Sequence, residues 1–246
     1  MDLISISILL IVTFSSFIQS ITGFGFAAVS APLLLFFMNP NYVVGLTVFG
    51  ALISNLWVIY KTKDKSDPKL VWPMFTSSLF GVLPGVYLLK IVDASILKLC
   101  IGILILLMSL FMAANFVIKI KKLKLATIGV GFVSGFLGGS TSLNGPPVAL
   151  FFMNQQQDKE TLRANIVHYF LLANIATLFI MYLMKTIDIG TIKQSLYVIP
   201  GVLLGTWIGE KVFIKISPVI FRRISLGIIF LCGAISVISG IIKSLA

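Results

Sequence analysis

A stretch without a single charged side chain runs from Leu3 to Tyr60. One membrane crossing needs about 20 apolar residues, so this stretch is too long for one transmembrane helix. The rest of the chain has the same character: 58% of its 246 residues are hydrophobic, 11% are charged and the mean hydropathy is +1.08. A soluble domain has about 25% charged residues. The sequence therefore predicts an all-α polytopic membrane protein in the lipid bilayer. A transmembrane β-barrel would instead show alternating segments of about 10 residues.

Charges and turn residues divide the chain into eight apolar elements. We expect turns at residues 39–41 (Asn-Pro-Asn), since proline and asparagine favour turn conformations, and in the polar stretch 61–69. The predicted elements are Leu3–Phe37, Val43–Tyr60, Leu70–Leu89, Ile96–Ile118, Leu125–Asn154, Leu162–Met184, Ser195–Gly209 and Ile224–Ile242.

Two of these elements are interrupted. The first breaks at residues 22–25 (Thr-Gly-Phe-Gly) and restarts with Pro32, and the second breaks at residues 138–144 and restarts with Pro146-Pro147. In lipid, such a break leaves backbone N–H and C=O groups unpaired unless protein or a water-filled cavity satisfies them. A broken apolar segment in corresponding positions of two halves indicates the binding site of a transporter.

Internal similarity indicates two repeats. Residues 30–39 align with 145–154, both ending in Phe-Phe-Met-Asn, and residues 81–85 match 201–205. We therefore predict two four-element repeats, residues 1–120 and 121–246, which together form one membrane domain. In the second repeat Gly201, Gly205 and Gly209 are spaced four apart, which lets helix backbones approach closely.

The loop charges bear on the topology. If both broken elements fold back as hairpins, loops 61–69, 119–124, 155–163 and 211–223 share one side and hold 14 of the 19 Lys and Arg residues. The positive-inside rule favours this arrangement, which would also make the two halves inverted copies. Full crossing by each broken element stays an alternative, because Leu3–Thr22 is by itself long enough to span.

The breaks also supply the candidate binding groups. A helix that restarts inside the membrane presents free N–H groups and about half a positive charge, which suits an anion. Side-chain capping of the broken helices or contacts between neighbouring helices would also explain each polar residue taken singly, but they explain less readily the whole set appearing at both breaks. Ser20 adds a hydroxyl group at the first break. The predicted substrate-binding residues near the breaks are Gln19, Thr22, Gly23, Gly25, Gly138, Gly139, Ser140, Thr141, Ser142 and Asn144.

Two asparagines extend the candidate site. Asn55 and Asn174 occupy matching places inside the second and sixth elements, so we predict that both bind substrate, with interhelical hydrogen bonding as the alternative. Asn165 lies nine residues before Asn174, about half a turn around the helix, and cannot face the same site.

Two ionisable residues in the sixth element each allow two interpretations. His168 is the one histidine and a candidate for proton coupling, with a structural hydrogen bond as the alternative. Arg163, near the membrane edge, either attracts anions or anchors the end of its helix. Asp188 and Glu210 sit at segment ends, and the lack of deep carboxylates favours an anion over a metal cation.

Several classes of protein do not fit. The net charge of +11 resides in short loops and has no RNA-binding signature, so no nucleic-acid partner is expected. Cys100 and Cys232 lie alone in apolar segments and predict neither a disulfide nor a metal site. We expect that the protein binds no cofactor and is not an enzyme, since the sequence offers neither a nucleophile–base pair nor a metal cluster. Residues 1–5 lack a basic signal-peptide region and are expected to remain in the mature protein.

These two breaks resemble those of the TauE/SafE sulfite-exporter family. The resemblance rests on residues 22–32 (Thr-Gly-Phe-Gly-Phe to Pro) and 135–147 (Gly-Phe-Leu-Gly-Gly to Gly-Pro-Pro) and extends over essentially the whole chain. It implies a multi-pass permease of the bacterial inner membrane that moves sulfite, sulfoacetate or related anions, often outward. Both breaks have fewer glycines than is usual in the family, which leaves the substrate within this class open.

The leading functional hypothesis is therefore a secondary transporter for small sulfur-containing anions with an alternating-access site at the breaks. An anion channel and a carrier of another small anion are alternatives, and a membrane-embedded enzyme or a scaffold fits less well. The oligomeric state stays open, with a homodimer as one option.

Overall fold

The computed structural model describes residues 3–217, apart from 63–64, 94–95, 98, 101–102, 104–106, 108–121 and 156. The predicted element Ile224–Ile242, and most of Ile96–Ile118, lie outside these residues. The described helices are α1 (Leu3–Thr22), α2 (Phe26–Leu34), α3 (Pro40–Thr62), α4 (Pro68–Ile91), α6 (Leu123–Thr141), α7 (Gly145–Met153), α8 (Lys159–Leu183), α9 (Ile189–Ser195), a 3-10 turn (Leu196–Val198) and α10 (Ile199–Lys215).

The all-helical membrane fold is confirmed. Six segments of the described chain are long and apolar enough to cross a membrane: Ile4–Thr22, Pro40–Tyr60, Pro68–Ile91, Leu123–Thr141, Lys159–Leu183 and Ile189–Lys215. By contrast, α2 and α7 have nine residues each. At 1.5 Å per residue they are about 13 Å long, less than half of a hydrocarbon core of about 30 Å.

Local chemistry explains where several helices begin. Pro40, expected in a turn, is instead the first residue of α3. Proline is tolerated there because a backbone N–H in the first turn of a helix has no partner within the helix, so its absence costs nothing. The carboxylate of Asp158 caps α8 by accepting from the backbone N–H groups of Glu160 and Thr161. The Thr161 hydroxyl also donates to it at 2.6 Å, which lowers the pKa of Asp158, so this cap is kept at neutral pH and lost in acid.

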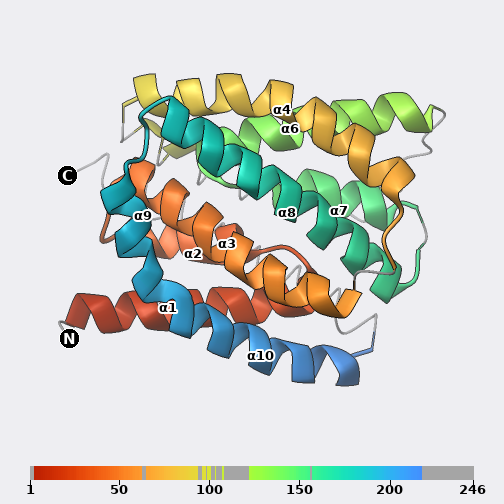
Figure 1. Ribbon diagram of the computed structural model, residues 1–246, viewed down its shortest axis with the longest axis horizontal. Coiled ribbons are helices and arrows are strands. Elements are labelled where there is room, and N and C mark those ends of the chain that lie inside the picture. The colour runs from red at the N-terminus through yellow and green to blue at the C-terminus, as the bar shows by residue number, and fades with distance from the viewer. Residues whose placement is uncertain are drawn as a thin grey trace.

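The broken elements fold back on themselves. One pocket is lined by Ser5, Met38, Tyr42 and Tyr197. The start of α1, the segment that follows α2 and the start of α3 therefore lie at the same end of the bundle, which we call the N-terminal end. Figure 1 shows this end on the left and the return from α1 through α2.

The opposite end, which we call the basic end, holds the connection between α3 and α4, the starts of α6 and α8 and the end of α10. Lys65 forms an ion pair with Glu160 there, and Lys159 donates to the carbonyl of Ile216. Figure 1 shows these segments together on the right. The pair α6 and α7 starts from this end and returns to it, so it runs opposite to the pair α1 and α2.

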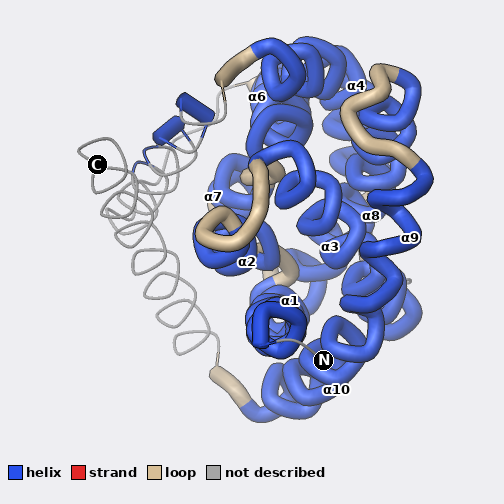
Figure 2. Tube along the Cα trace, turned by 90° about the vertical axis from the view of Figure 1, so that its left-hand side faces the viewer, coloured by secondary structure: helices blue, strands red, loops and turns tan. Residues whose placement is uncertain are grey.

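Two pairs of parallel helices flank the centre of the bundle. In Figures 1 and 2, α4 packs beside α6 on one side and α1 beside α10 on the other, with α2, α3, α7 and α8 between them. Glycines make both contacts close, as predicted for Gly201, Gly205 and Gly209: a Cβ on Gly209 would lie 2.6 Å from the carbonyl oxygen of Phe17. On the other side a Cβ on Gly139 would lie 2.7 Å from the carbonyl oxygen of Val82.

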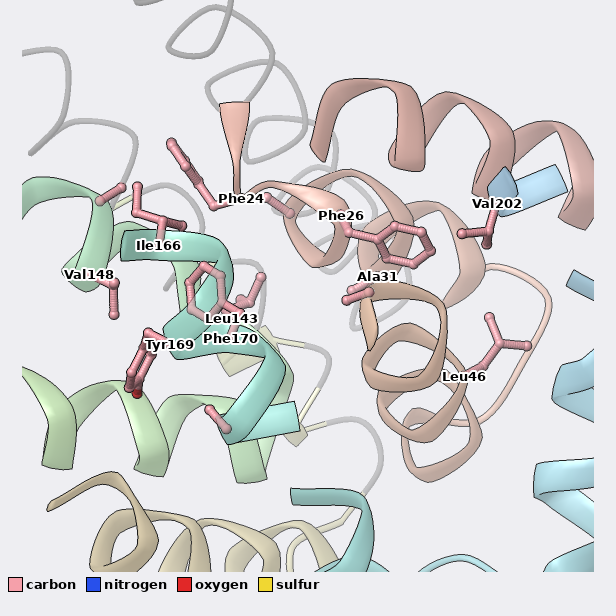
Figure 3. Packing of buried hydrophobic residues seen from close by; sticks show 14 of the residues in the cluster. Phe24, Phe26, Ala31, Leu46, Leu143, Val148, Ile166, Tyr169, Phe170 and Val202 are labelled. Atoms are coloured by element: carbon pink, nitrogen blue, oxygen red, sulfur yellow. The ribbon is translucent and has the colours of Figure 1, made fainter. Parts of the chain in front are cut away.

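The central core joins both breaks to α8. Phe24 from the first break and Leu143 from the second are buried in one apolar cluster with Ile166, Tyr169 and Phe170 of α8. Figure 3 shows these side chains gathered in the interior. The breaks are therefore held from the side by large apolar groups, while their backbone groups need polar partners.

The glycine contacts yield a stability prediction. A Cβ on Gly135 would overlap the carbonyl oxygen of Ser78, so Gly135→Ala must separate α6 from α4. We expect a loss of about 1–3 kcal/mol, the usual cost of overpacking, measured as a lower midpoint of thermal unfolding in detergent.

Gly129 on the same helix is the matched control. A Cβ there meets nothing within 4 Å, so Gly129→Ala removes only the helix penalty of glycine and should leave stability unchanged or raise it by up to about 1 kcal/mol. Equal midpoints for the two variants would contradict close α4–α6 packing.

Candidate functional site

The first break is a glycine turn that reverses the chain. Gly23 and Gly25 have φ angles of 80° and 106°, a region that residues with a Cβ rarely adopt. Helix α2 restarts at Phe26, directly after this turn. The prediction that Pro32 restarts the helix is therefore wrong, because the two glycines alone make the reversal and Pro32 lies well inside α2.

Gln19 ties this restart to the neighbouring helix. Its Oε1 accepts from the Phe26 backbone N–H at 3.2 Å, and its Nε2 donates to Asn55 Oδ1 at 2.7 Å and to the Ala51 carbonyl at 3.2 Å. The N–H of Phe26 can only donate, so it fixes the orientation of the Gln19 amide and then of the Asn55 amide. One buried side chain thus satisfies the break and positions Asn55.

The second break uses other residues for the same purpose. Helix α6 ends with Ser142 in a left-handed conformation (φ 61°), and α7 restarts at Gly145 with prolines in its first turn. The carbonyl of Asn144 accepts from Ser134 Oγ at 3.0 Å, and Tyr169 of α8 donates to the same Ser134 hydroxyl at 2.9 Å.

Each break contains a threonine that forms the same set of hydrogen bonds, and the two threonines are 119 residues apart in the sequence. Thr22 and Thr141 each donate to the carbonyl four residues earlier, and each accepts from the backbone N–H two residues later, in Phe24 and Leu143. Asn55 and Asn174 are separated by the same spacing. The helices α2 and α7 also start 119 residues apart, so the alignment on Phe-Phe-Met-Asn does not pair their starts.

The N-termini of α2 and α7 meet at one small cavity in the middle of the bundle. The cavity has a volume of about 20 Å³, and Phe24, Gly25, Gly145 and Phe170 contribute to its wall. Water needs about 10–15 Å³ by this measure, so the cavity has room for about one water molecule. Its polar lining residues are Gln19, Thr47, Asn55, Ser142, Asn144 and Asn174.

Two lining groups are donors without a partner. Asn55 Nδ2 and Thr47 Oγ1 are buried and form no hydrogen bond with any described residue. Leaving a buried donor unpaired costs about 1–3 kcal/mol. A ligand with acceptor oxygens in the cavity would remove this cost.

Not all predicted binding residues lie at this cavity. Gln19, Gly25, Asn55, Ser142, Asn144 and Asn174 line it, so the structure brings together residues from both halves. Thr22 and Thr141 instead bond to the backbone of the breaks. Ser140 donates to the carbonyl of Phe136, and Gly23, Gly138 and Gly139 are buried against neighbouring residues.

The residues of α8 divide as their spacing predicts. Asn174 faces the cavity, whereas Asn165 accepts from the Asp67 backbone N–H at 2.6 Å and donates to Gln157 at 2.9 Å. His168 Nδ1 lies 2.8 Å from the carbonyl of Ala164 on its own helix, and His168 is not part of the cavity wall.

Sequence reasoning missed two features of the structure. Thr47 gave no signal, because one threonine in an apolar run is unremarkable. Arg163, expected to attract anions or to anchor the end of its helix, is only 2% exposed and forms an ion pair with Glu210. Their meeting depends on the packing of α8 near α10, which no local pattern reveals.

The chemistry available at the cavity is that of neutral donors. Within the described ranges, no three His, Cys, Asp or Glu side chains come close enough to hold a metal ion. Amides, hydroxyls and two helix N-termini remain, and together they suit an anion with several acceptor oxygens.

Comparison with known proteins agrees with this chemistry. The family described as sulfite exporter TauE/SafE matches residues 8–235. This protein belongs to the TauE/SafE family. It is similar to the probable sulfite/organosulfonate exporter TauE of Cupriavidus necator, with 26% identity over 239 residues, covering 89% of this chain and 88% of that protein. No solved structure matches the chain. As a TauE/SafE protein with six candidate spans, it is a multi-pass membrane transporter.

The role of Gln19 can be tested directly. Gln19→Ala removes the acceptor for Phe26 N–H and the donor for Asn55, so we expect a loss of about 2–4 kcal/mol in stability and a loss of transport. The measurements are the unfolding midpoint in detergent and anion flux in proteoliposomes. Gln155→Ala, in the loop after α7, is the matched control and should change neither.

Proposed function

We propose that this protein is a carrier for small sulfur-containing oxyanions such as sulfite or sulfoacetate, with its substrate site at the cavity between the two breaks. The observation that carries the proposal is the meeting of two helix N-termini with the unpaired donors Asn55 Nδ2 and Thr47 Oγ1. The family and the name of the relative in Cupriavidus necator support a sulfur-containing substrate.

This site attracts an anion without a fixed positive charge. Each helix N-terminus contributes about half a positive charge, and both α2 and α7 start at the cavity. The groups that bind the oxyanion are then neutral when it leaves, so release does not strand a buried cation. Such a site favours reversible binding, which a carrier needs.

The two halves are proposed to be inverted repeats that alternate access to this site. The pair α1 and α2 starts from the N-terminal end and the pair α6 and α7 from the basic end, while Thr22 and Thr141 repeat the same hydrogen bonds. Alternating access commonly arises when one such half moves against the other around a fixed site.

The size of the cavity favours a carrier over a channel. A space of about 20 Å³ is too small for an oxyanion with three oxygens, so the site must widen to bind one. A channel would keep a continuous path. The channel remains an outcome that the flux experiment distinguishes.

The proposed direction is export across the inner membrane. Moving a divalent anion out of a cell with a negative interior is favoured by about 4–5 kcal/mol per 100 mV, so no coupling ion is required. The basic end would face the cytoplasm, because it carries most of the loop lysines among the described residues.

Flux in proteoliposomes tests the proposal. Purified protein is offered sulfite, sulfoacetate, sulfate and chloride in turn under a set membrane potential. We expect saturable flux of a sulfur oxyanion, accelerated by a potential that drives anions across. Linear, non-saturating conductance would favour the channel, and no anion flux under any gradient would refute the proposal.

Asn55→Asp is the sharpest variant for the site. It keeps the shape of the side chain but replaces the free amide donor by a carboxylate that repels an anion, so we expect at least a hundredfold loss of flux. The matched control is Asn41→Asp, an exposed residue in the first turn of α3, which should transport normally. Normal transport by Asn55→Asp would place the substrate elsewhere.

His168 provides a separate prediction. Because its Nδ1 bonds to Ala164 of its own helix and it lies outside the cavity wall, we expect His168→Gln to leave the pH dependence of flux unchanged. Flux measured between pH 6 and 8 would reveal a proton-coupling role by a flattened profile.

A further inference from the structure

A buried ion pair lies at the basic end, apart from the cavity. Arg163 of α8 donates from Nη2 to Glu210 of α10. The side chain of Arg163 is 2% exposed and that of Glu210 is 16% exposed, so the arginine is enclosed while the carboxylate is partly accessible. The guanidinium also stacks over the ring of Phe213 at 4.1 Å.

The hydrogen-bonding capacity of this guanidinium is only partly used. Arg163 Nε is buried and has no partner in the described part of the chain. Together with an Nη group it forms the planar fork that binds two oxygens of one oxyanion. Buried arginine is costly, whereas the residue 119 positions earlier is Val44, which is fully buried in an apolar cluster.

The position of Arg163 links it to the substrate site. A Cβ on Gly23 would lie 3.3 Å from Arg163 Cγ, so the arginine packs directly on the first break. The next residue, Phe24, lines the cavity. Arg163 therefore lies between the surface of the basic end and the cavity.

We propose that Arg163 is a second binding residue for the oxyanions that the carrier transports, and that the Glu210 carboxylate competes with them for it. The identity of the anion rests on the proposed function. In the structure Glu210 pairs with the guanidinium; an oxyanion that arrives at the basic end displaces Glu210 and binds to the Nε and Nη groups.

Glu210→Gln tests the competition. The substitution removes the competing negative charge and leaves a buried guanidinium unpaired. A bound anion then supplies the opposite charge that Glu210 no longer provides. Thermal unfolding of the full-length protein is followed by tryptophan fluorescence while inorganic sulfite or sulfate is added. We expect Glu210→Gln to unfold at a lower temperature without anion, and to be restored at a concentration at least tenfold below that needed to stabilise the wild type.

Two variants control for other causes. Glu160→Gln removes another carboxylate of the basic end, one that pairs with the exposed Lys65, and should respond to anion as the wild type does. The double variant Arg163→Gln/Glu210→Gln should lose the increased sensitivity to anion that Glu210→Gln shows. The proposal is overturned if Glu210→Gln responds like the wild type, or if its gain persists without Arg163.

Further arms keep the outcomes separate. If Glu210→Gln does not fold, Glu210→Asp weakens the pair by shortening the side chain, and it must also respond to less anion than the wild type. Asn55→Asp/Glu210→Gln should keep the gain, because Arg163 acts apart from the cavity. A wild type without anion flux refutes the proposed function, whereas wild-type flux without the Glu210→Gln gain refutes this inference alone.

Discussion

The structure depends on how an apolar bundle satisfies two interrupted helices in its interior. Lipid cannot pair a free backbone N–H or C=O, so each break needs its own polar partners within the protein. Gln19 supplies them at the first break by reaching from α1 to Phe26 and across to α3. Ser134 and Tyr169 supply them at the second. The same arrangement leaves donor groups facing one cavity, so the solution to a folding problem also creates the candidate binding site.

The close helix pairs on either side have a complementary role. The carbonyls of α1 approach the glycines of α10, and those of α4 approach the glycines of α6, closely enough to exclude any side chain. These contacts need no hydrophobic driving force between the helices, which lipid would not provide. They let each broken element pair with a helix of the other half and hold the breaks at the centre.

The two ends of the bundle are packed by different physical means. At the N-terminal end, Val44 packs in a cluster with Leu89, Met181 and Ile187. At the basic end, Arg163 and Glu210 form an ion pair. Apolar contacts respond little to salt or to anions, whereas an ion pair can exchange one anionic partner for another. Under the proposed function, this difference would make transport sensitive to the substrate on one side only.

The sequence by itself determined the membrane class, the two breaks and the glycine spacing of α10, because lipid solvation and backbone geometry act locally along the chain. It also identified Gln19, Asn55, Ser142, Asn144 and Asn174 as polar groups inside apolar runs. It misplaced the restart of α2 at Pro32, since two glycines suffice to reverse the chain. Only the tertiary structure decided which of these groups share a cavity, that Thr47 joins them, and that Arg163 meets Glu210. Those meetings are between helices far apart in sequence, and their register is set by packing along the whole bundle.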